Sequence, residues 1–295
     1  MIPQYPIFSK LNIKNRDEII ELNSKYPPYS DFNFTSIYCW DTDETAEVSM
    51  LNNNLVIKLP GYLTGNKIVS ILGNINIDAS IKILLKDYPK LELVPQIIID
   101  NISEFNDLKI TEDRDNFDYI VNASDLAELS FHNFPKKRKM LDKFTANFPN
   151  IQSQIINLND SEMIDRIISL FKLWSQNHGK SETESNSELI ALKRLINNHG
   201  SFKESYALGL FDNKQLVGFN TFEIIDQEFG ISSFQKGDAN YDYIYVKITN
   251  ELAKFLSPKC KLINFEQDLG FVGLRNSKLS YHPVEFLKKY IISTI

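Results

Sequence analysis

The densest group of chemically versatile side chains lies near the carboxyl end of the chain, at positions 266–282. Two carboxylates come first, Glu266 and Asp268, and a carboxylate can orient or deprotonate an amine. A guanidinium, an ammonium, a phenol and an imidazole follow, and the cations among them suit a phosphate or carboxylate. We therefore predict a catalytic role for Glu266 or Asp268. The predicted substrate-binding residues are Arg275, Lys278, Tyr281 and His282.

The same stretch also has a purely structural interpretation. Arg275 and Lys278 are three residues apart and share one face if the segment is helical. In the structural interpretation, Asp268 caps that turn, Arg275 pairs with Glu266, and Tyr281 packs in the core. Ion pairs of this kind perturb carboxylates as active sites do. Spacing alone therefore leaves both interpretations open.

A second feature is a basic run inside a predicted helix over positions 134–148. At 3.6 residues per turn, Lys136, Lys139 and Lys143 fall on one stripe, beside an apolar stripe of Met140, Leu141, Phe144 and Phe148. We expect the apolar stripe to dock and the basic edge to face the phosphates of a nucleic acid or an anionic headgroup. A solvated charged face is the alternative. The candidate nucleic-acid-binding residues are Lys136, Lys137, Arg138, Lys139 and Lys143.

The elements that would position these residues alternate between helical and strand periods, which indicates an α+β fold with mixed sheets. In the first half we predict helices near 17–22 and 79–88, and strands near 46–50, 55–59, 67–72, 91–94, 108–111 and 119–121. In the second half we predict helices at 134–148, 161–176, 188–198 and 242–256, and strands at 154–158, 205–211, 215–225, 229–234 and 261–265.

The order of the elements suggests a repeated fold. The second half runs helix, helix, hairpin, strand, helix, strand, which is the order of the GNAT acyltransferase core. The first half has a similar order at weaker contrast, without a repeat at the level of sequence. We therefore expect two tandem GNAT-like acyltransferase domains, at residues 1–128 and 129–295, with the basic joining helix at the start of the second.

Several familiar binding motifs are missing from the chain. It has neither G-x-x-x-x-G-K-[ST] nor G-x-G-x-x-G, and no G-x-S-x-G. The acyl-CoA signature of GNAT enzymes, R/Q-x-x-G-x-G/A, would fall near Gln235, where Gly237 stands alone. Because one glycine makes a poor cradle for a pyrophosphate, we expect no required cofactor, with acyl-CoA as an alternative. The histidines and cysteines show no metal-ligand spacing, so no metal site is predicted.

Composition narrows the class of protein. The chain has 295 residues, a formal net charge of -6 and 43% hydrophobic residues, as globular proteins do. An acidic chain is unsuited to nonspecific binding along nucleic acid, but it can still carry a local basic edge. The chain shows no signal-peptide pattern and no apolar run near the roughly 20 residues of a membrane span. We therefore expect a cytoplasmic protein without a transmembrane segment.

Three groups of motifs resemble a large bacterial family of unknown function. That family is related to the catalytic C-terminal domain of phosphatidylglycerol lysyltransferase. The motifs run in order along nearly the whole chain: Ser30–Ser36; Tyr119–Ile120 with Asp125–Leu129 and Lys136–Arg138; and Glu266–Gly270 with Gly273–Arg275 and Lys278–Pro283.

The resemblance implies two tandem GNAT-like domains joined through a basic helix, with kinship to the Fem-type aminoacyltransferases. Lysyltransferases of this kind take an aminoacyl group from a charged tRNA and pass it to a lipid headgroup. We therefore expect an aminoacyl-tRNA-dependent acyltransferase whose acceptor is an amine or hydroxyl on a small molecule or a headgroup. Two alternatives remain, an acyl-CoA-dependent N-acyltransferase and a non-catalytic ligand-binding module on the GNAT fold.

Overall fold

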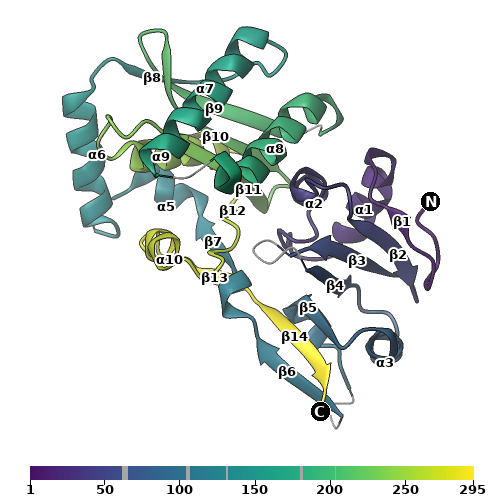
Figure 1. Cartoon of the computed structure of the whole chain (residues 1–295). Coiled ribbons are helices and arrows are strands. Elements are labelled where there is room, and N and C mark those ends of the chain that lie inside the picture. The colour runs from purple at the N-terminus through teal and green to yellow at the C-terminus, as the bar shows by residue number, and fades with distance from the viewer. Residues whose placement is uncertain (62–65, 104–106, 131, 180–181, 203) are drawn as a thin grey trace. The chain divides into compact units, whose positions relative to one another are not determined.

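The structure is a computed structural model, and it describes residues 1–61, 66–103, 107–130, 132–179, 182–202 and 204–295, with backbone only at 182–184 (Figure 1). The chain forms two compact units. Unit 1 contains residues 1–119, 267–277 and 286–295, and unit 2 contains residues 120–266 and 278–285. Both units are discontinuous along the chain, whereas the predicted domains are continuous segments whose division stays a prediction.

Unit 1 contains two antiparallel sheets and short helices. Its helices are α1 (Arg16–Asn23), α2 (Phe34–Trp40), α3 (Ile77–Asp87) and α4 (Gln96–Ile99), with 3-10 turns at Ile13–Asn15 and Arg114–Asn116. Its strands are β1 (Ser9–Lys10), β2 (Glu47–Leu51), β3 (Asn54–Pro60), β4 (Lys67–Leu72), β5 (Lys90–Pro95), β6 (Leu108–Glu112) and β14 (Lys289–Thr294).

The sheets of unit 1 differ in how their strands follow one another. Strands β1 to β4 pair in chain order. The second sheet has the order β5-β14-β6, so its middle strand is the last strand of the chain. Apolar side chains from both sheets and from α3 form the core, among them Val56, Ile71, Leu84, Val94 and Ile292. Each of these five side chains is removed from water, which stabilises the unit.

Unit 2 contains the two longest described helices, α7 (Ser161–Asn177) and α8 (Glu182–Asn198). Its other helices are α5 (Ala123–Glu128), α6 (Pro135–Asn147) and α9 (Ile244–Leu256), with a 3-10 turn at His199–Ser201. Its strands are β8 (Ile151–Ile155), β9 (Ser205–Asp212), β10 (Gln215–Ile224), β11 (Phe229–Gly237) and β12 (Leu262–Asn264). Three elements contain a boundary between the units: β7 (Asp118–Asn122), α10 (Val272–Leu279) and β13 (Glu285–Leu287).

The sheet of unit 2 confirms the strand order predicted from the sequence. Strands β8, β9, β10 and β11 form an antiparallel meander. Helix α9 then crosses over to β12, which pairs with β11 in parallel, and parallel strands require such a crossover. Helix α9 lies close to β10, because a Cβ added at Gly218 would come within 2.8 Å of Ile248 Cδ1. The glycine therefore permits the helix to pack directly on the strand.

The same order of elements occurs twice along the chain. Two helices, three antiparallel strands, a helix and a strand run from α1 to β5, and again from α7 to β12. In the second sheet of unit 1, β14 lies between β5 and β6; in the sheet of unit 2, β7 lies between β12 and β13. The predicted α+β class with mixed sheets is thus confirmed. Among the described residues, none of the helices combines the length and hydropathy that crossing a bilayer requires.

Candidate functional site

Asp268 is the center of a buried ion-pair network in unit 1. Its side chain is 0% exposed. Arg275 binds it with two hydrogen bonds, from Nε to Oδ2 at 2.9 Å and from Nη2 to Oδ1 at 2.7 Å. Arg114 and the Tyr119 hydroxyl also donate to this carboxylate, and so does the amide of Gly270. Burial raises the pKa of Asp268, but these donors outweigh burial and lower the pKa below its ordinary value.

Arg275 is held by two carboxylates, neither of which is the predicted Glu266. Its guanidinium also donates to Asp115 at 2.6 Å, and the hydrogen bonds that it donates to Asp268 and Asp115 raise its pKa. The structural interpretation predicted an ion pair between Arg275 and Glu266. That prediction is wrong, because Arg275 pairs with Asp268 and Asp115. Asp268 does accept from the amide of the turn that precedes α10, as that interpretation expected.

A second buried network in unit 1 lies around Lys289, which the sequence analysis did not single out. The side chain of Lys289 is 0% exposed, and its Nζ contacts Asp31 and lies 2.8 Å from Asp118 Oδ1. Burial lowers the pKa of Lys289, but the two carboxylates outweigh burial and raise it. Ser30 donates to Asp118, from its amide at 2.8 Å and its hydroxyl at 2.6 Å.

The remaining predicted residues lie in unit 2. Glu266 is half-buried with φ at 57°, and its amide donates to Asn264 Oδ1 at 2.6 Å. Lys278 Nζ donates to the carbonyl of Phe265 at 2.6 Å. The Phe265 ring meets the Tyr281 ring edge to face, with centroids 5.7 Å apart. Tyr281 is buried, and burial raises its pKa to about 12.

The basic helix and the C-terminal cluster, separate features of the sequence, meet in unit 2. Lys137 Nζ lies 3.9 Å from the centroid of the Tyr281 ring, a cation–π contact. The rings of Phe134 and His282 stack with centroids 4.8 Å apart. Burial lowers the pKa of Lys137 to about 8 because an ammonium loses hydration in an apolar environment. Lys137 therefore faces the cluster, in contrast to the solvent-facing lysines of the same helix.

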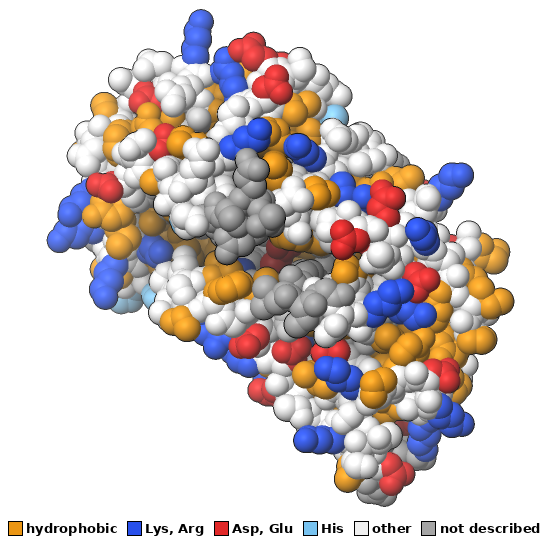
Figure 2. Space-filling view, in the orientation of Figure 1, with side chains coloured by type: hydrophobic (Ala, Val, Ile, Leu, Met, Phe, Trp, Pro, Cys, Tyr) orange, Lys and Arg blue, Asp and Glu red, His pale blue; other side chains and the backbone are white. Residues whose placement is uncertain are grey.

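The rest of α6 follows the predicted amphipathic pattern. Leu141 and Phe144 are buried. Three lysines are exposed on the solvent side: Lys136, Lys139 and Lys143. Figure 2 shows lysine and arginine side chains along the left edge of the view, where α6 lies in Figure 1. Arg138 instead pairs with Asp142 at 3.1 Å, one helical turn away.

The segment between β11 and α9, where GNAT enzymes bind the acyl-CoA pyrophosphate, is acidic. Asp238 is 4% exposed, and its Oδ1 accepts from the amide of Asn240 at 3.0 Å. A Cβ at Gly237 would come within 2.6 Å of Ile244 Cγ2, so this glycine permits helix packing. A buried carboxylate in this segment would repel a pyrophosphate bound there.

Sequence reasoning missed several residues of these networks. Arg114 and Asp115 lie between predicted strands, and Lys289 lies on a strand that was not predicted. The available signal was the motif pattern, because Ser30, Asp31 and Tyr119 belong to the motifs that carry the family resemblance. That resemblance pointed to their importance without indicating their partners.

Comparison with known proteins identified one family. The family model described as phosphatidylglycerol lysyltransferase, C-terminal, matches residues 25–293. None of the curated proteins matches the sequence.

Three solved structures are similar over most of their length. A conserved protein of unknown function from Bacteroides thetaiotaomicron has a TM-score of 0.86 at 25% identity, with 100% of both chains covered. The C-terminal domain of a putative lysylphosphatidylglycerol synthetase from Agrobacterium fabrum has a TM-score of 0.61 at 12% identity, covering 94% of this chain and 92% of that one. L-PGS from Bacillus licheniformis has a TM-score of 0.62 at 11% identity, covering 99% and 93%. At these identities, the last two show a shared fold.

Proposed function

The chain belongs to the family of the phosphatidylglycerol lysyltransferase C-terminal domain, and on that premise we propose that it is an aminoacyl-tRNA-dependent acyltransferase. The acceptor would be an amine or hydroxyl of a small molecule or a headgroup. The family match is confirmed over residues 25–293. The observation that carries the tRNA part of the proposal is α6, whose exposed lysines belong to the helix that contacts Tyr281 and His282.

The proposed reaction needs a proton acceptor and a leaving group. The acceptor nitrogen or oxygen attacks the ester carbonyl carbon of the charged tRNA, and the bond from that carbon to the ribose oxygen breaks. The acceptor loses a proton, and the ribose oxygen gains one. Glu266 is the preferred base, since this residue belongs to unit 2, as Tyr281 and Lys137 do. Asp268 is a weaker base, because its donors lower its pKa.

Other predicted residues take supporting roles in this proposal. Lys278 positions the segment after β12 through its hydrogen bond to the carbonyl of Phe265. Asp268 orients Arg275, which would hold an anionic group only by sharing its guanidinium with two carboxylates. The nucleic-acid contacts come from Lys136, Lys139 and Lys143, whose charges would replace counterions along the RNA backbone.

A transfer assay tests the proposal. Purified protein is incubated with tRNA charged with a labelled amino acid, and with cell extract divided into lipid and water-soluble fractions. We expect label to move into one fraction, and Glu266→Gln to slow transfer by about 100-fold, the usual contribution of a general base. Glu285→Gln is the matched control because that glutamate is exposed in the same unit. Absence of transfer from any charged tRNA would contradict the proposal.

An acyl-CoA-dependent reaction is the second candidate, favoured by the strand order of unit 2. The buried Asp238 next to α9 argues against it, because its negative charge would repel a pyrophosphate. We expect calorimetry to detect no binding of acetyl-CoA or longer acyl-CoAs at millimolar concentration. If binding is found and Asp238→Asn strengthens it, the acyl-CoA reaction replaces the proposed one.

The transfer assay also tests the role of Glu266. If Glu266→Gln leaves transfer from charged tRNA unchanged, Glu266 is not the general base.

A further inference from the structure

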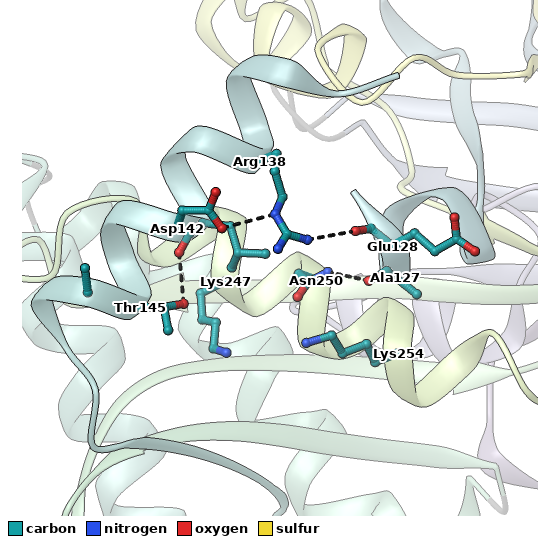
Figure 3. Close-up of a pocket in the computed structure, with 10 residues that line it drawn as sticks. Ala127, Glu128, Arg138, Asp142, Thr145, Lys247, Asn250 and Lys254 are labelled. Atoms are coloured by element: carbon teal, nitrogen blue, oxygen red, sulfur yellow. Dashed lines mark hydrogen bonds and ion pairs between the residues drawn. The ribbon is translucent and has the colours of Figure 1, made fainter. Parts of the chain in front are cut away.

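A pocket in unit 2 lies where α5, α6 and α9 meet, and has a volume of about 510 Å³ (Figure 3). Arg138 and Asp142 contribute from α6, and Lys247, Asn250 and Lys254 contribute from α9. Helix α6 therefore forms one wall of the pocket and also carries the exposed lysine stripe. At 3.6 residues per turn, the faces that carry Asp142 and Lys143 adjoin each other.

The lysines of the pocket outnumber their carboxylate partners. Lys247 and Lys254 both donate to Glu251 Oε1, each at 2.9 Å, and Ser153 donates to Oε2 at 2.6 Å. Burial raises the pKa of Glu251, but hydrogen bonds from Ser153, Lys254 and Lys247 outweigh it and lower the pKa to about 2. One carboxylate thus faces two ammonium groups, which leaves one positive charge unbalanced. Lys254 is 50% exposed at its side chain and can turn toward a ligand.

The other charges of the pocket do not remove this excess. Arg138 and Asp142 pair with each other and cancel. Figure 3 shows the Glu128 carboxylate turned away from Arg138 and both lysines, while the backbone carbonyl of Glu128 accepts from Arg138. The pocket therefore favours an anionic group. The Arg138–Asp142 pair and the Lys254 side chain are exposed enough to exchange partners at little cost.

Asn250 adds a requirement for a hydrogen-bond donor. Its side chain is 0% exposed, and its Nδ2 donates to the carbonyls of Leu126 at 2.9 Å and Ala127 at 2.8 Å. Carbonyl oxygens only accept, so these two contacts fix the orientation of the amide. Its Oδ1 then faces the other way and has no hydrogen-bond partner among the described residues (Figure 3). A donor from a ligand would recover the free energy that this burial costs.

A ribose phosphate carries both groups, an anion and a hydroxyl donor. We propose that this pocket binds one ribose phosphate of an RNA, with Lys247 and Lys254 at the phosphate and Asn250 Oδ1 accepting from the 2′-hydroxyl. The inference rests on the proposed function, in which that RNA is the charged tRNA. A lipid surface suits the site less well, because the large apolar side chains of α6 are buried or half-buried and an interfacial helix must expose them.

Binding of fluorescently labelled tRNA, followed by anisotropy over a series of KCl concentrations, tests the pocket. We expect Lys254→Gln to weaken binding about fivefold at roughly 100 mM KCl and to make the salt slope shallower by about one, as the loss of one phosphate contact does. Lys261→Gln is the matched control, since Lys261 pairs one to one with Glu228 in the same unit. We expect it to leave affinity and slope unchanged.

Unlabelled oligonucleotides of one sequence, as RNA and as DNA, then compete with the labelled tRNA. RNA should compete better, because only RNA has the 2′-hydroxyl. Equal competition would overturn the assignment of Asn250.

The remaining outcomes separate the pocket from the proposed function. If Lys136→Ala/Lys139→Ala/Lys143→Ala weakens tRNA binding but Lys254→Gln does not, the pocket inference is overturned and the proposed function stands. If the unaltered protein binds no tRNA, both are overturned. Vesicles of phosphatidylglycerol form the last arm: if Lys254→Gln weakens vesicle binding and leaves tRNA binding unchanged, the site belongs to a lipid surface.

Discussion

Asp268 shows how one residue can hold distant parts of unit 1 together. Its carboxylate accepts from Arg275 seven residues away and from Arg114 and Tyr119, which are 154 and 149 residues away. A fully buried carboxylate costs much free energy in desolvation unless several donors surround it. These donors supply that compensation, and they restrict the side chain to one orientation.

Replacing Asp268 by Asn should therefore destabilise the protein by about 3 kcal/mol, the usual cost of breaking a buried ion pair from one side. Urea unfolding at neutral pH measures this. Asp115→Asn is the control, because that side chain is 60% exposed and surface pairs contribute about 0–1 kcal/mol. Because the pKa of Asp268 is lowered by folding, its contribution is complete above its unfolded pKa of about 3.9 and is lost as pH falls through the folded pKa. Equal effects of the two variants would contradict this account.

Lys137 differs from its neighbours on α6 by contacting Tyr281. Its pKa of about 8 predicts that half of its amine is neutral near pH 8. We expect acylation by a pulse of acetic anhydride, read by mass spectrometry of the Lys137 peptide, to rise with a midpoint near that pH. In urea the midpoint should return to about 10.4, the value of a hydrated lysine. A midpoint that unfolding leaves unchanged would refute the burial effect.

At the scale of elements, β14 determines the shape of the second sheet of unit 1. It pairs with β5 on one side and with β6 on the other. Its first residue, Lys289, also forms the buried network with Asp31 and Asp118. Both backbone edges and one face of this strand thus contribute to the stability of unit 1.

Truncating Ile292, which is 0% exposed in the core of unit 1, to Ala should cost about 2–5 kcal/mol. Thr294→Ala on the same strand is the control, since Thr294 is exposed and surface changes usually stay within about 0.5 kcal/mol. Thermal unfolding by circular dichroism measures both variants. If both lower the melting temperature equally, β14 is not the buried middle strand.

Most elements of the second half of the chain were predictable because apolar and polar side chains alternate along them with a clear helical or strand periodicity. Helix α7 and strands β9, β10 and β11 lie within a few residues of the predicted ranges. Strand β8 lies at Ile151–Ile155, three residues before its predicted start at 154. The helix α2 was not predicted, because five of its seven residues are buried, which hides the polar face of an amphipathic helix.

At the scale of the whole molecule, strands outside the two repeated runs of elements complete the sheets of both units. Strand β7, which follows the first run, belongs to the sheet of unit 2, and β14, at the end of the chain, belongs to unit 1. A strand that follows one run of elements along the chain can therefore belong to the other compact unit.

The fragment 1–128 should consequently fail to fold cooperatively, because it lacks β14 and residues 267–277 of unit 1. Without β14, strands β5 and β6 have no partner between them, and Asp118 and Asp31 lose the Lys289 ammonium. Circular dichroism during urea unfolding should show no sharp transition for the fragment, in contrast to the full chain. A sharp transition would show that the first 128 residues form an independent domain.

The sequence by itself determined the local features of this protein: the amphipathic α6 with its exposed lysines, the α+β class and the family. These features follow from side-chain periodicity and from short motifs, both of which involve residues that are close together in the sequence. Only the tertiary structure decided that Arg275 binds Asp115, that Lys137 lies on Tyr281, and that β14 completes unit 1. The physical reason is that a period specifies which face of an element is apolar, whereas the partner of that face is chosen by packing between segments more than one hundred residues apart.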